Sequence, residues 1–341
     1  MSGYGTALAS AIALAVLFSL VLTPIAIRLA WRIGWLDQPQ ARKLHTSATA
    51  LLGGAVVVVS AGLAWFVAPR MTGAAFTPLA PGLLAGGVLA LALGLWDDRF
   101  GLDPRPKLIA QATSAVLLVR AVGAPGIGLP GALEFGLSVL AVMALMNAIN
   151  FLDNMNGMLG GIVSLTLLSF AVISAGPGAR QAGAAQVALA GACLGFLPYN
   201  FPRARIFLGD AGSLVLGYSL AASLLLALQA APRGWSQLGP PLLLAYPAFD
   251  MMFVVIRRLR EGRRIDQGGR DHTNHRIASL IQCPTRTVLL IWCSTAALCA
   301  SGIALSRQQR PEPALLVWGL WIILFLLTGR RLSSVPLSPK A

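Results

Sequence analysis

The sequence predicts an all-α, polytopic integral membrane protein with about 11 transmembrane helices. Of the 341 residues, 56% are hydrophobic and only 11% are charged, whereas about a quarter of the residues of a soluble domain are charged. Long apolar stretches recur along the whole chain, and no polar segment between them is long enough to form a soluble domain. The basic residues also alternate in density from loop to loop. We therefore expect a single polytopic membrane domain over residues 1–341.

A transmembrane helix needs about 20 mostly apolar residues, and segments that approach this length occur eleven times. In order, they are Ala7–Leu29, Leu51–Val67, Pro81–Leu95, Lys107–Val122, Leu133–Ala148, Met158–Ile173, Gly183–Tyr199, Gly212–Gln229, Pro240–Ile256, Thr287–Leu305 and Ala314–Thr328. Several are short for a full crossing, so we expect tilted helices or a locally thinner bilayer around them. No internal repeat is evident, whereas such repeats are common in secondary transporters.

The Lys and Arg residues determine the expected orientation. If the N-terminus lies outside, 20 of the 26 Lys and Arg residues fall in one set of loops and six in the opposite set. The positive-inside rule makes the richer set cytoplasmic. The same distribution accounts for the net charge of +14, so we expect no nucleic acid as a partner.

This orientation brings most of the acidic residues to the cytoplasmic face. Ten of the 12 Asp and Glu residues and all three His residues lie there. Carboxylates at the edge of a bilayer are costly unless they bind a cation or take part in chemistry. We therefore expect the functional site in the cytoplasmic loops 31–50, 96–107, 147–158, 200–213 and 257–286.

The loop after the third span carries Asp97 and Asp98, followed closely by Arg99, Arg105 and Lys107. Two adjacent carboxylates repel each other, so a counter-charge is expected beside them. The plain alternative is a solvated loop with surface ion pairs. A paired carboxylate directly after an apolar run favours a functional role instead.

The loop after the fifth span holds Asn150, Asp153 and Asn156, each three residues from the next. On a helical turn this spacing places them on one face. Their oxygens suit Mg²⁺, and their amides suit the polar edges of a substrate. Helix capping is the alternative, but it explains only Asn156 with Gly157.

The segment Phe207–Ser213 reads Phe-Leu-Gly-Asp-Ala-Gly-Ser. Its glycines allow a backbone to approach a phosphate closely, and the N-terminus of the following helix favours anions. Asp210 beside such an anion would suggest a bridging Mg²⁺. The alternative is that Asp210 or Ser213 is an ordinary N-cap.

The longest polar segment contains Arg270, His272 and His275. These side chains suit a sugar or a diphosphate, whereas the basic stretch 257–264 is better explained as a solvated cytoplasmic loop. A two-histidine metal site would lack the usual further ligands. Lys43, in a basic cluster before the second span, and Asp250, inside the ninth span, are open between a structural and a functional role.

Taken in order, these motifs resemble those of the polyprenyl-phosphate N-acetylhexosamine-1-phosphate transferase superfamily. The resemblance covers about residues 42–286, and the segments that carry it are Asp97-Asp98 with Lys107, Asn147–Gly157, Phe207–Ser213 and Asp271–Ile277. The chain departs from the family pattern at Asn154, where a glycine is frequent. It departs again in its last motif, His272-Thr273-Asn274-His275, which is one histidine short.

The eleventh span agrees better with the undecaprenyl-phosphate GlcNAc-1-phosphate transferase branch than with the ten-span MurNAc-pentapeptide translocase branch. The resemblance implies transfer of a sugar-1-phosphate, GlcNAc-1-phosphate in that branch, from a UDP-N-acetylhexosamine to undecaprenyl or another polyprenyl phosphate. UMP would be released at the cytoplasmic face of a bacterial inner membrane, as the first membrane step of a cell-envelope glycan.

The resemblance also implies Mg²⁺ as the cofactor, with Mn²⁺ as an alternative ion, and it assigns roles to individual residues. Asp210 and Asn150 would bind the metal. Asp97, Asp98 and Asp153 would be catalytic. The substrate-binding residues would be Lys43, Lys107, Asn156, Phe207, Arg270, His272 and His275.

Two other functions are weighed against this one. The first is the MurNAc-pentapeptide translocase of peptidoglycan synthesis. The second is a secondary transporter of phosphorylated solutes, which would place ionisable residues near the bilayer midplane, whereas here they lie at helix ends. The sequence leaves open the amino sugar, the lipid length and whether the chain forms a homodimer.

Overall fold

The computed structural model describes residues 2–38, 47–72, 81–175, 180–265 and 269–335. Regular structure in these residues is almost entirely helical, which confirms the all-α class. The helices are α1 (Ser2–Ile33), α2 (Gly53–Thr72), α3 (Pro81–Phe100), α4 (Pro104–Val122), α5 (Gly131–Leu152), α6 (Met158–Ile173), α7 (Arg180–Asn200), α8 (Gly209–Ala230), η1 (Trp235–Leu238), α9 (Gly239–Leu242), α10 (Ala245–Arg260), α11 (Thr273–Ile281), α12 (Pro284–Leu305) and α13 (Pro311–Ser333). Two short antiparallel strands, β1 (Leu36–Asp37) and β2 (Thr49–Ala50), accompany them.

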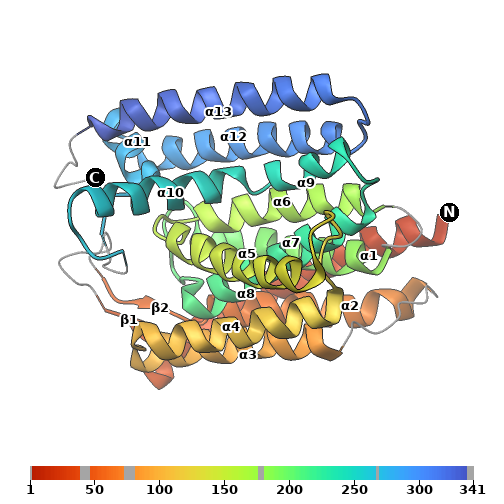
Figure 1. Ribbon diagram of the computed structural model, residues 1–341. Helices are drawn as coiled ribbons and strands as arrows, with labels where there is room; N and C mark the ends of the chain where they lie inside the picture. The colour runs from red at the N-terminus through yellow and green to blue at the C-terminus, as the bar shows by residue number, and fades with distance from the viewer. Residues whose placement is uncertain (1, 39–46, 73–80, 176–179, 266–268, 336–341) are drawn as a thin grey trace.

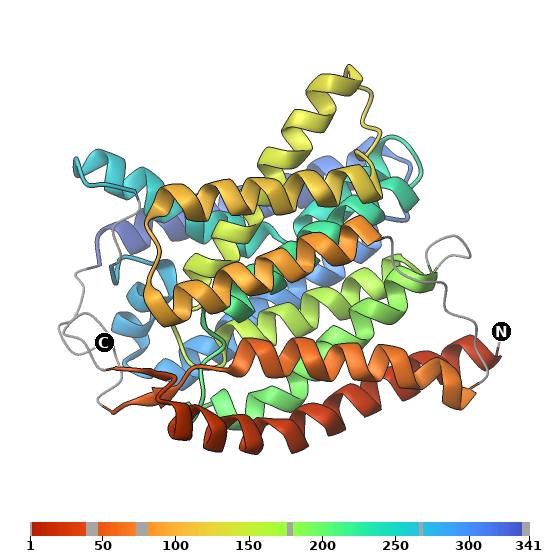
Figure 2. The same cartoon turned by 90° about the horizontal axis from the view of Figure 1, so that it is seen from below.

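The long helices lie side by side with their ends at two opposite faces of the bundle (Figure 1). The N-terminus lies at one face, and β1, β2 and α11 lie at the other. Helix α8 is central, since it packs against both α3 and α5, while α1 packs against α2 and α7. Seen from below, α5 is inclined steeply away from its neighbours (Figure 2).

Each of the eleven predicted spans lies on a helix, but one of them is broken. In the ninth, the pair η1–α9 meets α10 at an angle of 69°. Seven helices of the described chain are long and apolar enough to cross a membrane, or eight if the bent pair is one span. Helices α3 and α4 fall outside this set because charged side chains lie near their ends, and α6 has only 16 residues. A multi-pass membrane protein is thus confirmed, and the count of eleven crossings stays a prediction.

The start of α2 is held against the start of α8 by backbone contacts that only glycine permits. Gly53 and Gly54 donate their N–H groups to the carbonyl oxygens of Phe207 and Leu208, each at 3.0 Å. A Cβ atom on Gly54 would lie 2.1 Å from the backbone nitrogen of Gly212. This close approach fixes the loop before α8 at the end of the bundle that holds β1, β2 and α11.

Candidate active site

A pocket of about 770 Å³ opens at this end of the bundle, and all five loops predicted to be cytoplasmic contribute to its lining. Nine of the predicted site residues line it: Asp97, Asp98, Asn150, Asp153, Asn156, Phe207, Asp210, Arg270 and His275. Segments far apart in the sequence therefore meet in one place. Lys107 lies beside the lining, His272 lies behind it, and Lys43 falls outside the described residues.

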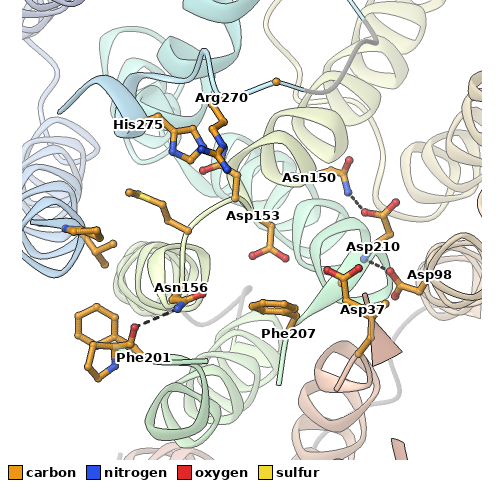
Figure 3. Close-up of a pocket in the computed structure, with 18 of the residues that line it drawn as sticks. Asp37, Asp98, Asn150, Asp153, Asn156, Phe201, Phe207, Asp210, Arg270 and His275 are labelled. Carbon is orange, nitrogen blue, oxygen red and sulfur yellow. Dashed lines mark hydrogen bonds between the residues drawn. The ribbon is translucent and has the colours of Figure 1, made fainter. Parts of the chain in front are cut away.

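The pocket has three chemically different sides (Figure 3). Asp98, Asp210 and Asn150 lie on one side, and the aromatic ring of Phe207 lies with Asn156 on another. Arg270 and His275 lie on the third side, and Asp153 lies near the centre of the pocket. An anionic molecule with a flat ring at one end could therefore contact all three sides at once.

Asp98 closes the N-terminus of α8. Its Oδ1 atom accepts the N–H of Asp210 at 2.8 Å, and its Oδ2 atom accepts the N–H of Ala211 at 3.1 Å. A carboxylate at this position is stabilised by the partial positive charge of the helix end. The expected anion site at the start of α8 is therefore filled by the protein's own carboxylate. The N-cap position is Leu208, without a side-chain cap, so capping by Asp210 or Ser213 is not what is observed.

The glycine before Asp210 is required by this contact. Gly209 has a φ of +69°, a conformation that other residues adopt at a cost. A Cβ atom there would also lie 2.5 Å from the Oδ2 atom of Asp98. The glycine in the Phe-Leu-Gly-Asp segment thus serves the approach of Asp98.

Lys107 is the counter-charge of the acidic side. Its Nζ atom lies 2.6 Å from Oδ2 of Asp97 and 2.5 Å from Oδ2 of Asp210. The other oxygen of Asp97 accepts the N–H of Leu102 at 2.7 Å. Arg99 points elsewhere and donates to the carbonyl oxygen of Gly34 at 3.0 Å. Both oxygens of Asp97 therefore already accept hydrogen bonds.

The amide of Asn150 supports the same carboxylate. Its Nδ2 atom donates to Oδ1 of Asp210 at 2.6 Å and to Oγ of Ser213 at 2.8 Å. A metal ligand would present the amide oxygen instead. The role of Asn150 as a metal ligand stays a prediction. It requires the amide group to rotate by half a turn, which exchanges the positions of its oxygen and nitrogen atoms in nearly the same volume.

Burial and mutual repulsion raise the pKa values of these acids. Burial raises the pKa of Asp98 to about 8, the Asp210 carboxylate adds to the rise, and the two N–H donors oppose it. The pKa of Asp153 rises to about 7 through burial and the charge of Asp210. Burial and Asp210 raise the pKa of Asp97 to about 6 against the effect of Lys107. The negative charge around Asp210 exceeds what one lysine neutralises.

His272 lies behind the pocket, bound to α10. Its Nδ1 atom lies 2.8 Å from Oδ2 of Asp250, whose other oxygen accepts the backbone N–H of Thr273 at 2.8 Å and its hydroxyl at 2.6 Å. Both His272 and Asp250 are buried. Asp250 thus holds the start of α11, and the role of His272 in binding a substrate stays a prediction.

His275 is the histidine that faces the pocket. Burial and the charges of His272 and Arg270 lower its pKa to about 4, so its imidazole is neutral near pH 7. Its Nδ1 atom is buried without a hydrogen-bond partner. A neutral imidazole in the lining of the pocket suits a hydroxyl group of a sugar.

A buried ion pair fixes the loop that leads to this histidine. Arg258, which is 2% exposed, donates to both oxygens of Asp271, from Nε at 2.9 Å and from Nη2 at 2.8 Å. Although burial opposes it, the hydrogen bonds and charge of Arg258 lower the pKa of Asp271 to about 2. The paired side chains thus secure Arg270 and His275 at the pocket.

The sequence interpretation missed several amides of the site. Asn200 accepts the N–H of Gly157 at 2.7 Å and donates to the carbonyl oxygen of Ile206 at 2.8 Å, so it joins two motif loops. Asn154, which lines the pocket, hydrogen-bonds to Asn274. The signal that could have found them is an asparagine at the end of an apolar helix, directly before or inside a motif loop.

Comparison with known proteins identifies the family. Residues 80–228 match the family model described as glycosyl transferase family 4. The chain is 33% identical over 300 residues to a decaprenyl-phosphate N-acetylglucosaminephosphotransferase of Mycobacterium tuberculosis, covering 77% of this chain and 74% of the relative. It is 28% identical over 324 residues to a probable undecaprenyl-phosphate N-acetylglucosaminyl 1-phosphate transferase of Bacillus subtilis, covering 90% and 85%.

A third relative extends the comparison to enterobacteria. The undecaprenyl-phosphate alpha-N-acetylglucosaminyl 1-phosphate transferase of Salmonella typhi is 27% identical over 328 residues, which cover 92% of this chain and 88% of the relative. The matches to the relatives of Bacillus subtilis and Salmonella typhi cover at least nine tenths of this chain. The chain belongs to the polyprenyl-phosphate N-acetylhexosamine-1-phosphate transferase superfamily, in its GlcNAc-1-phosphate transferase branch, and is a sugar-phosphate transferase of the membrane.

Proposed function

We propose that the protein transfers GlcNAc-1-phosphate from UDP-GlcNAc to undecaprenyl phosphate and releases UMP. The observation that carries this proposal is the meeting of an acidic side with a bridging lysine, an aromatic side and a basic side in one pocket at the end of an apolar bundle. Two anionic substrates that react with each other need a pocket whose positive groups offset their mutual repulsion and whose walls bind each of them. The names of the relatives supply the sugar and the class of lipid.

The donor would lie across the aromatic and basic sides. The ring of Phe207 offers a flat surface for the uracil base, and Asn156 offers amide hydrogen bonds beside it. Arg270 supplies positive charge for the diphosphate, because an arginine fork matches phosphate oxygens well. The neutral imidazole of His275 would then meet the sugar.

The acceptor would place its phosphate beside Asp97 and Lys107. Trp96 and Phe100, which flank the acidic pair, are 58% and 66% exposed. Exposed aromatic residues of this kind anchor helices at the level of the lipid headgroups. The acidic pair would therefore lie at the depth of a lipid phosphate, with the ammonium group of Lys107 available to attract it.

The residues around Asp210 fit Mg²⁺. This ion is held by one or two carboxylates together with water and substrate phosphates. No three His, Cys, Asp or Glu side chains of the described ranges could hold a metal by themselves, so substrate phosphates would have to complete the site. Asp210 offers carboxylate oxygens, and Asn150 offers an amide oxygen once its side chain has rotated, at a place where acidic groups crowd around one lysine. When bound, the ion would neutralise phosphate charge that develops during transfer.

The chemistry requires positioning more than covalent help. An oxygen of the lipid phosphate attacks the β-phosphorus of the UDP-sugar, a P–O bond forms between them, and the bond from the β-phosphorus to the bridging oxygen breaks. UMP leaves with that oxygen. Lys107 would hold the attacking phosphate in place, Arg270 would hold the diphosphate, and the walls of the pocket would align the two.

A panel of donors tests this function. Purified protein in detergent is incubated with undecaprenyl phosphate, Mg²⁺ and either UDP-GlcNAc, UDP-GalNAc or UDP-MurNAc-pentapeptide, and UMP is measured. We expect UMP only when lipid and donor are both present, with UDP-GlcNAc the best donor. UMP release with UDP-MurNAc-pentapeptide alone among the donors would assign the translocase function instead. No UMP with any donor would contradict the proposal and favour a transporter.

A further inference from the structure

Three hydrogen bonds form a continuous relay between the end of α5 and the start of α11. Asn154 donates from Nδ2 to the carbonyl oxygen of Phe151 at 2.7 Å. Its Oδ1 atom accepts a short hydrogen bond from Nδ2 of Asn274. The Oδ1 atom of Asn274 accepts the backbone N–H of His275 at 2.9 Å. The relay therefore runs from a carbonyl group at a helix C-terminus to an N–H group at a helix N-terminus.

At Asn274, the relay is buried where water cannot replace a lost partner. Asn274 is 0% exposed, and its Nδ2 atom also contacts the sulfur of Met158 at 3.3 Å. Both polar atoms of its amide are therefore used inside the protein. Loss of either partner would leave a buried polar group unsatisfied, which costs more than the loss of an exposed hydrogen bond.

The relay joins two side chains that line the pocket from different elements. Asp153 directly precedes Asn154 in the loop after α5, and His275 directly follows Asn274 in α11. The contacts of Asp250 with Thr273 and His272 tie α11 to α10, so they do not set its separation from the α5–α6 loop. The link between Asn154 and Asn274 spans that separation directly.

We propose that Asn154 and Asn274 are a positioning pair that sets the separation of Asp153 and His275 and thereby selects the donor sugar. This inference rests on the proposed function for the identity of the donor. The geometry that carries it is the direct contact of two amide side chains that lie 120 residues apart in the sequence and next to two residues of the pocket lining.

The pair acts on the donor and not on the acceptor. The acidic side that would receive the lipid phosphate is held by contacts among Asp97, Lys107 and Asp210, none of which involves either asparagine. His275 and Asp153 face the part of the pocket that remains for the sugar. A change in their separation therefore alters the fit of sugar hydroxyl groups while the lipid phosphate keeps its partners.

A double-mutant cycle tests the pair. Asn154→Ala, Asn274→Ala and the double variant are compared with the wild type for the KM of each substrate and for the Kd of UDP-GlcNAc and UDP-GalNAc by calorimetry. Each single change is expected to weaken UDP-GlcNAc binding about tenfold, because a displaced Asp153 or His275 would lose about one hydrogen bond to the sugar. The Kd of UDP-GalNAc divided by the Kd of UDP-GlcNAc should fall, which means a loss of donor selectivity. The KM of undecaprenyl phosphate should stay within about twofold of the wild-type value. The double variant should bind about as weakly as a single one, because the two side chains act as a unit.

The matched control is Gln229→Ala. This amide lies at the opposite end of α8 and donates to the carbonyl oxygens of Val122 and Ala124, each at 3.0 Å, so its removal should leave donor binding unchanged. Single effects that multiply in the double variant, or an equal loss of acceptor affinity, would overturn the inference. If Asn274→Ala does not fold, Asn154→Ala decides alone, and unchanged donor selectivity in that variant would overturn it too.

Calorimetry separates this inference from the proposed function, because it does not require turnover. A wild type that binds UDP-GlcNAc without releasing UMP would contradict the function and still permit the cycle. A wild type that binds no UDP-sugar would contradict both.

Discussion

The carboxylate of Asp98 accepts a 2.8 Å hydrogen bond from the backbone N–H of Asp210. This contact joins two acidic motifs that lie 112 residues apart in the sequence. It fixes the backbone of Asp210 at the start of α8, where the side chain of Asp210 lines the pocket. The same contact explains why a glycine precedes Asp210.

Two glycines have nearly the same backbone conformation, but only one contacts the site. Substituting each of them distinguishes the cost of backbone strain from the cost of a lost contact. Gly209 and Gly101 have φ values of +69° and +68°, but only Gly209 would direct a Cβ atom into Asp98. Gly101→Ala should cost about 1 kcal/mol of stability, the penalty for a left-handed residue, and should retain most activity. Gly209→Ala should also displace Asp98 and lose at least about tenfold in UMP release. Thermal unfolding in detergent and initial rates would show this, and equal losses in the two variants would refute the contact argument.

Asp210 is expected to be essential for turnover and dispensable for folding. In Asp210→Asn, Lys107 keeps its ion pair with Asp97, so the melting temperature should change little. The variant should retain less than about 1% of wild-type UMP release, because a charged Mg²⁺ ligand is lost. Chelation should abolish wild-type turnover, and Mg²⁺ or Mn²⁺ should restore it. Near-normal turnover of well-folded Asp210→Asn would remove Asp210 from the metal site.

The pH dependence of one variant distinguishes a base from an orienting group at Asp97. A lipid phosphate has its second pKa near 6, so it is about half dianionic at that pH and almost fully dianionic at alkaline pH. If Asp97 were a general base, the ratio of wild-type to Asp97→Asn rates would fall toward one as the pH rises above that value.

We expect the rate ratio to change with pH in the opposite direction, because Asp97 orients its neighbours: both of its oxygens already accept hydrogen bonds. The pKa of Asp97 is raised to about 6, so its charge is lost as the pH falls through that value. The rate ratio should therefore be constant at alkaline pH and fall toward one on the acid side. Rates measured from about pH 5.5 to 9 cover both cases. A ratio that falls on the alkaline side would establish Asp97 as the base.

The orientation of the bundle is open to labelling from either side of the membrane. In a protein without its native cysteines, Arg99→Cys and Arg203→Cys should react only from the cytoplasm, and Leu129→Cys only from outside. All three side chains are exposed, Arg99 in the last turn of α3 and the other two in loops between helices. This expectation follows from the distribution of basic residues, because 20 of the 26 Lys and Arg residues are expected on one side. The positive-inside rule makes that side cytoplasmic. Reaction of positions 99 and 203 from opposite sides would contradict a single cytoplasmic pocket.

The sequence was most informative where an acidic or amide residue follows an apolar run. Asp97, Asp98 and Asp210 could be placed at one face because each ends or begins a span, and the structure brings them together. The partner of His272 could not be predicted, because Asp250 lies 22 residues earlier inside a helix. The bend in the ninth span was also missed, because the apolar run around Pro240 and Pro241 continues without a polar break.

The contact between Asn154 and Asn274 shows a second limit. These side chains are 120 residues apart, and nothing in the pattern of either motif pairs them. Both were recognised only as departures from the family sequence. Their pairing depends on the packing of α11 against the loop after α5, which hydrophobic periodicity does not encode.

The most direct test of the account follows the β-phosphate of the donor. Purified protein is incubated with undecaprenyl phosphate, Mg²⁺ and UDP-GlcNAc labelled with ³²P at the β-phosphorus, and the lipid and aqueous phases are separated. Transfer of the sugar-1-phosphate predicts that the label moves into the lipid phase in step with the release of unlabelled UMP. Label that stays in the aqueous phase as UDP would mean that the sugar alone is transferred, which would contradict the account.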